Sequence, residues 1–464
     1  MGADSKPQRG KQRACDPRAL AWRILQLVER GGYADALLGT ALRQAEIGPA
    51  DGALVVRLVY GTIAWQLYLD HLLAGFSSRP LSELDPAIRT LLRMALFQVV
   101  QLDRVPAFAA VDTAVELAKR YRRGRASSFV NAVLRQAVSG WRHVPLPSAE
   151  RDLAGHWSVT FSHPRWLVEL WLAEYGPEET QALLAADNEP APTVLRVNRL
   201  RTSREALLAR WQDTAERAAK GRYSPAAIVF RGNPEDDPAY AAGEYTVQGE
   251  AAQLVGFLVA PQPGESILDA CAAPGGKSTH LAELMDDRGC IVALDPQARG
   301  VERIRKDARR LGLAAIRAQQ ADATTWSGTP EVFDRVLVDA PCSGLGTLRQ
   351  HPEIRWRRKR EDLPAFAALQ LRLLHATAAR VRPGGVLVYA TCTLTREENE
   401  SVIERFLAAE SSFRVEDPRL DLPDPARALV GPDYFLRTFP HRHGLDGFFA
   451  ARLRRAEGGG IVRG

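Results

Sequence analysis

The sequence has few cysteines and no long apolar run. Its 464 residues include five scattered cysteines, an odd number that does not make the framework of a disulfide-rich secreted domain. No cysteine or histidine cluster has the spacing of a zinc site, so we expect no metal. No apolar stretch approaches the roughly 18–20 residues of a membrane span. The basic start MGADSKPQRGKQRAC lacks the apolar core of a signal peptide, and we predict a cytoplasmic protein with a disordered leader at residues 1–15.

Lysine is also scarce, whereas arginine is abundant. Of 61 basic residues only 7 are lysines, which leaves 54 arginines and a net charge of +6. Such a chain suits a polyanionic partner, because guanidinium groups bind phosphates bidentately and stack on bases. A GC-rich genome would produce the same bias, so composition alone leaves nucleic-acid binding open.

The spacing of apolar residues divides the chain into folded regions. The first carries helical periodicity throughout, with helix starts at Asp85-Pro86 and Pro106, which predicts an all-α bundle. In the last region short apolar strands alternate with helices, which is typical of a parallel α/β sheet. The closing segments YFLRTF and FFAARLRR are expected to pair as its antiparallel edge. The predicted regions are the bundle at 16–140, a linker at 141–164, a small α+β subdomain at 165–242 and the α/β domain at 243–464.

A loop of small residues follows the first strand of the α/β region, in ILDACAAPGGKSTHLAELM (267–285). It is not a phosphate-binding loop of the NTPase type, because Cys271 stands where that pattern requires its first glycine and Pro274 lies inside the loop. The absence of a GxGxxG motif also argues against a dinucleotide dehydrogenase. Asp295 and Asp322 follow the next two strands, where carboxylates can bind a ribose and meet an adenine, which favours S-adenosylmethionine. Either aspartate could instead cap its own helix.

Two cysteines lie just beyond the ends of apolar strands, in VLVDAPCSGLGT (336–347) and VLVYATCTLT (386–395). Beside a methyl donor, such thiols suit methylation of a pyrimidine, since a thiolate that adds to C6 makes C5 nucleophilic. The reaction also needs a carboxyl group to hold the base and a group that assists release. Asp339, Cys342 and Cys392 supply these types. Cys15 and Cys290 are better interpreted as small apolar side chains.

Three motifs, DACAAPGGK, VDAPCSGLGTLRQHPEIRW and YATCTLTREENE, resemble the signature blocks of the RsmB/Sun family of RNA 5-methylcytosine methyltransferases. GGYADALL, LDRVPAFAAVDTAVELAK and GRASSFVNAVLR resemble the NusB-like RNA-binding domain of that family's bacterial rRNA-methylating member. The resemblance implies a Rossmann-like, S-adenosylmethionine-dependent α/β core, preceded by an all-α NusB-like bundle and a small α+β RNA-binding subdomain. It implies methylation of a cytosine in 16S ribosomal RNA. We expect the protein to be a cytoplasmic monomer that binds neither a metal nor a membrane.

The resemblance also implies roles for individual residues. It makes Cys392 the nucleophile, Cys342 the residue that helps the product leave, and Asp339 a contact to cofactor and base. The cofactor-binding residues that it implies are Cys271, Ala272, Ala273, Pro274, Gly275, Gly276, Lys277, Asp295, Asp322 and Asp339.

The segment LRQHPEIRWRRKREDL (348–363) combines many basic side chains with one tryptophan. Such a segment can bind phosphates and stack on a flipped-out base, although a solvated helix start is the alternative. RYRRGR (120–125) is a second candidate patch. The predicted RNA contacts are Arg349, Arg355, Trp356, Arg357 and Arg358.

Two other functions stay open on the sequence alone. A non-catalytic RNA-binding assembly factor could be built on a methyltransferase fold, but the intact cofactor loop and both thiols argue against it. A cytosine-C5 methyltransferase acting on tRNA or DNA would use the same chemistry. A DNA enzyme would place its nucleophile in the Pro-Cys block, at Cys342.

Overall fold

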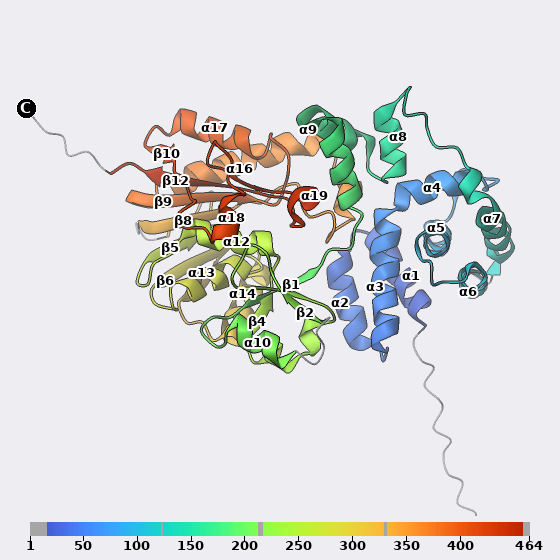
Figure 1. The fold of residues 1–464 in the computed structure, drawn as a ribbon, viewed down its shortest axis with the longest axis horizontal. Helices are drawn as coiled ribbons and strands as arrows, with labels where there is room; N and C mark the ends of the chain where they lie inside the picture. The colour runs from blue at the N-terminus through green and yellow to red at the C-terminus, as the bar shows by residue number, and fades with distance from the viewer. Residues whose placement is uncertain (1–15, 122–123, 212–216, 329–331, 458–464) are drawn as a thin grey trace, which may run out of the picture. The chain divides into compact units, whose positions relative to one another are not determined.

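A computed structural model describes residues 16–121, 124–211, 217–328 and 332–457 (Figure 1). The chain forms two compact units. The first runs to Leu184 and takes in Gln350–Arg357; the second holds Ala185–Arg349 and the chain from Arg358 onward. The predicted leader, and Arg122 and Arg123 of the RYRRGR patch, lie outside the described residues.

The first unit is helical, as its apolar periodicity predicts. Helix α5 begins at Pro86, and its N-cap Asp85 accepts a hydrogen bond from the Ala87 amide at 2.9 Å. Helix α6 begins directly after Pro106, which confirms the second predicted start. The helices are α1 (Pro17–Glu29), α2 (Ala34–Gln44), α3 (Pro49–Ala64), α4 (Gln66–Ala74), α5 (Pro86–Gln101), α6 (Ala107–Arg120), α7 (Ser127–Gly140), α8 (Leu153–Thr160), most of α9 (Arg165–Ala186), and α15 (Ile354–Arg357). Among the described helices none alone could cross a membrane, and only α3 with α4, bent by 72°, passes on length and composition.

A small antiparallel sheet opens the second unit. Its described strands lie in the order β2-β3-β1-β4, and β1 pairs with both β3 and β4. Buried Leu195, Ile228 and Phe230 form its core with the short helix α10. The elements are β1 (Thr193–Val197), α10 (Arg204–Arg210), β2 (Ala218–Lys220), β3 (Ala227–Phe230), α11 (Pro238–Ala241) and β4 (Tyr245–Val247).

The rest of the second unit is a mixed sheet of eight strands in the described residues, in the order β10-β12-β9-β8-β5-β6-β7, with β11 on β12. Strands β5 to β9 run parallel, whereas β12 is antiparallel to β9, β10 and β11. The closing segments therefore form an antiparallel pair, as predicted. The sequence did not indicate β10, which also pairs with β12. The strands are β5 (Ser266–Asp269), β6 (Cys290–Asp295), β7 (Ile316–Gln320), β8 (Phe333–Asp339), β9 (Val381–Thr391), β10 (Phe413–Val415), β11 (Leu436–Thr438) and β12 (Phe448–Arg455).

Helices cover both faces of this sheet. Successive residues of a strand point to opposite faces, so Leu337 of β8 packs with α12 and α13, whereas Val336 and Val338 pack with α16 and α17. The arrangement confirms the predicted Rossmann-like α/β core, whose ligands bind at the carboxyl ends of the parallel strands. The helices are α12 (Glu250–Val259), α13 (Gly276–Leu284), α14 (Ala298–Leu311), α16 (Leu363–Ala378), α17 (Glu400–Ala409), α18 (Asp424–Arg427) and α19 (Pro440–His443).

Candidate active site

Two thiols meet beyond the carboxyl ends of β8 and β9. These strands are parallel neighbours, so the loops that follow them emerge at the same edge of the sheet. The Sγ atoms of Cys342 and Cys392 lie 3.4 Å apart. The hydrogen bond to Cys392, together with burial, raises the pKa of the Cys342 thiol well above its ordinary value. A protonated Cys342 can therefore donate a hydrogen bond to a thiolate at Cys392.

A buried carboxylate, Glu398, holds both thiol loops in place. Its side chain is fully buried, and its Oε2 accepts hydrogen bonds from the Ser343 amide at 2.8 Å and from Gln370 Nε2 at 3.0 Å. Its Oε1 accepts from Thr395 Oγ1 at 3.0 Å. Sequence reasoning missed this residue, although the TREENE end of the third motif was the signal that could have found it.

An ion pair lies beside the thiols. Lys277 Nζ donates a hydrogen bond to Asp339 Oδ2 at 2.6 Å. Burial lowers the pKa of Lys277, but the negative charges of Asp339, Cys392 and Asp269 outweigh it and raise that pKa overall. The structure thus groups Lys277, Asp339, Cys342 and Cys392, four of the predicted site residues.

The loop Cys271–Gly275 and the first turn of α13 form the predicted cofactor cradle. Gly275 has a φ of +111°, which glycine adopts without strain, and a Cβ there would lie 3.1 Å from the Cα of Ile304. Helix α13 begins at the next residue, so its first N–H groups face the loop. Buried Asp269, at the end of β5, accepts from Ser278 Oγ at 2.6 Å, and burial raises its pKa to about 7. Its Oδ1 has no partner among the described residues.

Asp295 and Asp322 each bind the backbone two residues further on. Asp295 Oδ1 accepts from the Gln297 amide at 2.8 Å, and Asp322 Oδ1 accepts from the Thr324 amide at 2.9 Å. The Thr324 hydroxyl also binds Asp322, and these bonds lower the pKa of its carboxyl. Both aspartates therefore cap their own loops, and both still present carboxylates at the ends of adjacent strands, as ribose and adenine binding requires.

Gly300 is a further residue of this site that sequence reasoning missed. A Cβ there would lie 2.4 Å from Asp295 Oδ1 and 2.9 Å from the Cβ of Ala273. Only glycine lets α14 pass this close to the loop Cys271–Gly275 and to Asp295. The glycine cradle, the helix N-terminus, the unpartnered carboxylate oxygen and the acidic strand ends fit S-adenosylmethionine.

Within the segment Gln350–Arg357, Arg355 points into the protein instead of toward a predicted RNA surface. Arg355 is 0% exposed and donates to the backbone carbonyl of Ser162 at 3.1 Å. Trp356 Nε1 donates to the carbonyl of Ile63 at 2.7 Å, and its ring packs against the helical core. The prediction that Arg355 contacts RNA is wrong, because a side chain with no exposed surface cannot reach a phosphate. The Trp356 indole is only partly buried, and its contact with RNA stays a prediction.

The other three predicted RNA contacts are partly buried. Arg349 and Arg357 donate to backbone carbonyls. Arg358 Nε donates to the carbonyl of Ser343 at 2.8 Å, next to Cys342 in the chain. Contact with RNA through these arginines stays a prediction.

One group in the first unit brings possible metal ligands together. Single ligand atoms of Asp35, His351 and Glu353 lie within 4.8 Å of one another. Glu353 Oε1 already accepts a hydrogen bond from the Ala34 amide at 3.0 Å, at the start of α2. We assign no metal to this group, and the expected absence of a metal stays a prediction.

Comparisons with known proteins show which family the chain belongs to. Family models match successive parts of the chain: the NusB family at residues 16–139, the ferredoxin-like domain of RsmF/B-like methyltransferases at 163–234, and the 16S rRNA methyltransferase RsmB/F at 256–454. The chain is 36% identical over 439 residues to the probable ribosomal RNA small subunit methyltransferase B of Bacillus subtilis (strain 168), covering 93% of this chain and 97% of that protein. The chain belongs to the RsmB/F family.

Other matches to this RsmB/F-family chain extend over most of its length. The ribosomal RNA small subunit methyltransferase B of Pseudomonas putida is 37% identical over 445 residues, covering 94% of this chain and 98% of that protein. PH0851, known from a crystal structure, is 26% identical to this chain in sequence. The two structures superpose with a TM-score of 0.82, covering 95% of this chain and 99% of that one. NSun6 from Pyrococcus horikoshii, solved with SFG, is 22% identical with a TM-score of 0.57 over 63% and 98% and shows the fold alone. Family membership confirms the expected S-adenosylmethionine-dependent RNA methylation and cofactor.

Proposed function

We propose that the protein transfers a methyl group from S-adenosylmethionine to C5 of a cytosine in 16S ribosomal RNA, through a covalent bond between Cys392 and C6 of the base. The observation that carries this proposal is the 3.4 Å separation of the Cys342 and Cys392 thiols beside the cofactor loop. Relatives named as small-subunit rRNA methyltransferases support the substrate class.

The residues of the site supply each part of this chemistry. When bound, S-adenosylmethionine supplies an electrophilic methyl group. The Cys392 thiolate adds to C6 of a flipped-out cytosine, which makes C5 nucleophilic. After C5 is methylated, loss of its proton and departure of the thiolate restore the ring. Asp339, fixed by its bond to Lys277, hydrogen-bonds the N3/N4 edge of the base and stabilises the adduct.

Cys342 can assist release, because its thiol lies 3.4 Å from the Cys392 sulfur and its contact with Cys392, together with burial, raises its pKa. A thiol that keeps its proton is a poor nucleophile, because the thiolate is the attacking species. It can instead donate a hydrogen bond to the departing sulfur of Cys392.

A labelled methyl-transfer assay tests the proposal. Wild-type protein and Cys392→Ala are given unmodified 16S rRNA, tRNA or duplex DNA. Wild type should form 5-methylcytosine in 16S rRNA, and Cys392→Ala should lose turnover by orders of magnitude while binding S-adenosylmethionine normally. Cys290→Ala is the matched control, since Cys290 lies at the opposite, amino end of β6. Transfer to DNA alone, or turnover by Cys392→Ala, contradicts the proposal.

A further inference from the structure

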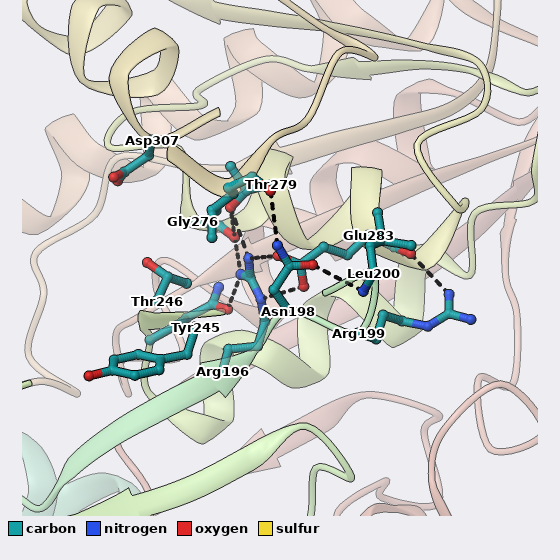
Figure 2. Close-up of polar contacts among 12 residues, drawn as sticks. Arg196, Asn198, Arg199, Leu200, Tyr245, Thr246, Gly276, Thr279, Glu283 and Asp307 are labelled. Carbon is teal, nitrogen blue, oxygen red and sulfur yellow. Dashed lines mark hydrogen bonds and ion pairs between the residues drawn. The ribbon is translucent and has the colours of Figure 1, made fainter. Parts of the chain in front are cut away.

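Arg196 of the small sheet reaches the cofactor loop of the methyltransferase core. It lies on β1, and its side chain is 0% exposed. Figure 2 shows its guanidinium group pointing at α13, among Gly276, Thr279 and Glu283. The surrounding sequence, TVLRVNRL, gives no sign of this role, because an arginine in a short strand is usually exposed.

Every N–H donor of this guanidinium has a partner. Nε and Nη2 donate to the two carboxylate oxygens of Glu283 at 3.1 and 2.7 Å, and Nη2 also donates to Thr279 Oγ1 at 3.0 Å. Nη1 donates to Gln248 Oε1 at 2.5 Å and to the carbonyl oxygen of Gly276 at 2.6 Å. Because the five donors lie in one rigid plane, a single side chain fixes all four partners relative to one another.

Two of these contacts, to Gly276 and Thr279, lie in the first turn of α13, and the contact to Glu283 lies in its last turn. Gly276 is the first residue of the helix and directly follows the loop Cys271–Gly275. The Thr279 hydroxyl, which Arg196 holds, donates in turn to the carbonyl of Gly275 at 2.9 Å. The network therefore fixes the end of the loop and the helix turn whose N–H groups face the cofactor. Glu283 is itself buried, so water does not weaken the pairing.

We propose that Arg196 is a positioning residue for S-adenosylmethionine and that the small sheet is thereby part of the methyl-donor site. Its guanidinium holds the loop from behind, through the Gly276 carbonyl and the Thr279 hydroxyl, without touching the reacting atoms. A lysine would keep the positive charge, but one ammonium group cannot span Glu283 and the Gly276 carbonyl together. The inference rests on the family's cofactor and is independent of which base is methylated.

Equilibrium binding of S-adenosylmethionine, measured without RNA, tests this role. We expect Arg196→Met and Arg196→Lys to weaken binding roughly tenfold or more, the loss expected for one charge-assisted hydrogen bond. Arg199→Met is the matched control, because Arg199 lies just beyond β1 and also contacts α13 (Figure 2). Arg199 Nη1 donates to the carbonyls of Glu283 and Leu284 at the C-terminal end of α13. The Arg199 side chain is 52% exposed. Affinity of this control should stay within about twofold of wild type.

A second variant separates positioning from stability. Arg196→Met leaves the Glu283 carboxylate buried and unpaired, which can unfold the protein, whereas Arg196→Met with Glu283→Met removes both charges. The proposal predicts that the double variant melts closer to wild type than Arg196→Met does and still binds S-adenosylmethionine roughly tenfold more weakly, since the Gly276 contact is gone. Wild-type affinity in the double variant or in Arg196→Lys would show that Arg196 only stabilises the fold, and would overturn the proposal.

Discussion

Buried ionisable side chains around the site take different protonation states because their partners differ. Lys277 keeps its charge because it faces Asp339, and Cys342 keeps its proton because it is buried against a second thiol. Among the residues that the structure describes, Asp269 is bonded to a serine hydroxyl and to no cation, and burial raises its pKa to about 7. These differences assign the charges of the site before any ligand binds.

The buried Asp269 makes stability depend on pH. Its folded-state pKa of about 7 exceeds the ordinary 3.8, so the folded protein loses stability as pH rises from about 4 to about 7. Asp269→Asn should remove this loss and gain up to about 4 kcal/mol over wild type by pH 8. Calorimetric melting at pH 5 and pH 8 measures the difference. The pKa of the Asp322 carboxyl is lowered, so Asp322→Asn should show no gain in stability at high pH. A stability difference between Asp269→Asn and wild type that does not change with pH refutes the assignment.

Glu398 determines the positions of both thiols. Glu398→Ala removes the acceptor for the Ser343 amide and for Thr395, each of which costs about 1–3 kcal/mol when left buried and unpaired. We expect kcat to fall at least about tenfold while the affinity for S-adenosylmethionine is unchanged. The adjacent Glu397 pairs with Arg360 at the surface, so Glu397→Ala is the control and should be near wild type. Normal kcat in folded Glu398→Ala would contradict this role.

At the level of elements, close packing between α14 and the cofactor loop depends on one glycine. Gly300→Ala would place a methyl group 2.4 Å from Asp295 Oδ1, so the loop or the helix must shift. We expect the Kd for S-adenosylmethionine to rise by roughly tenfold or more. Gly52→Ala on α3 has its nearest atom at 3.8 Å and should instead stabilise the protein by about 0.5–1 kcal/mol. Unchanged affinity in Gly300→Ala would show that the loop does not depend on this contact.

The segment Gln350–Arg357 is an element whose arginines serve the fold. Arg355→Met leaves the Ser162 carbonyl without its donor and should lower the stability of the helical unit by about 1–3 kcal/mol. Thermal melting followed by circular dichroism measures the change. Lys119→Met, which removes an exposed cation from the same unit, should leave the melting temperature nearly unchanged. A variant of Arg355 with normal stability but weakened RNA binding would restore the original prediction.

Over the whole molecule, the described residues form two units with separate cores. Much of this organisation was predictable, because local signals specify it: Asp85 and Pro86 mark the start of α5, Pro106 marks that of α6, and each parallel strand ends at, or within two residues of, an aspartate or cysteine. The buried roles of Arg196, Arg355 and Glu398 were not predictable. Arginine and glutamate usually face water, and only tertiary contacts reveal where they are buried and hydrogen-bonded.

The central claim is that Cys392 forms the bond to the base and Cys342 helps to break it. Cys342→Ala, incubated with unmodified 16S rRNA and S-adenosylmethionine, tests it most directly on a denaturing gel. We predict a protein–RNA adduct that survives denaturation, because addition proceeds while release stalls. The double variant Cys342→Ala with Cys392→Ala should form no adduct. Absence of the adduct, or an adduct that persists without Cys392, would contradict the account.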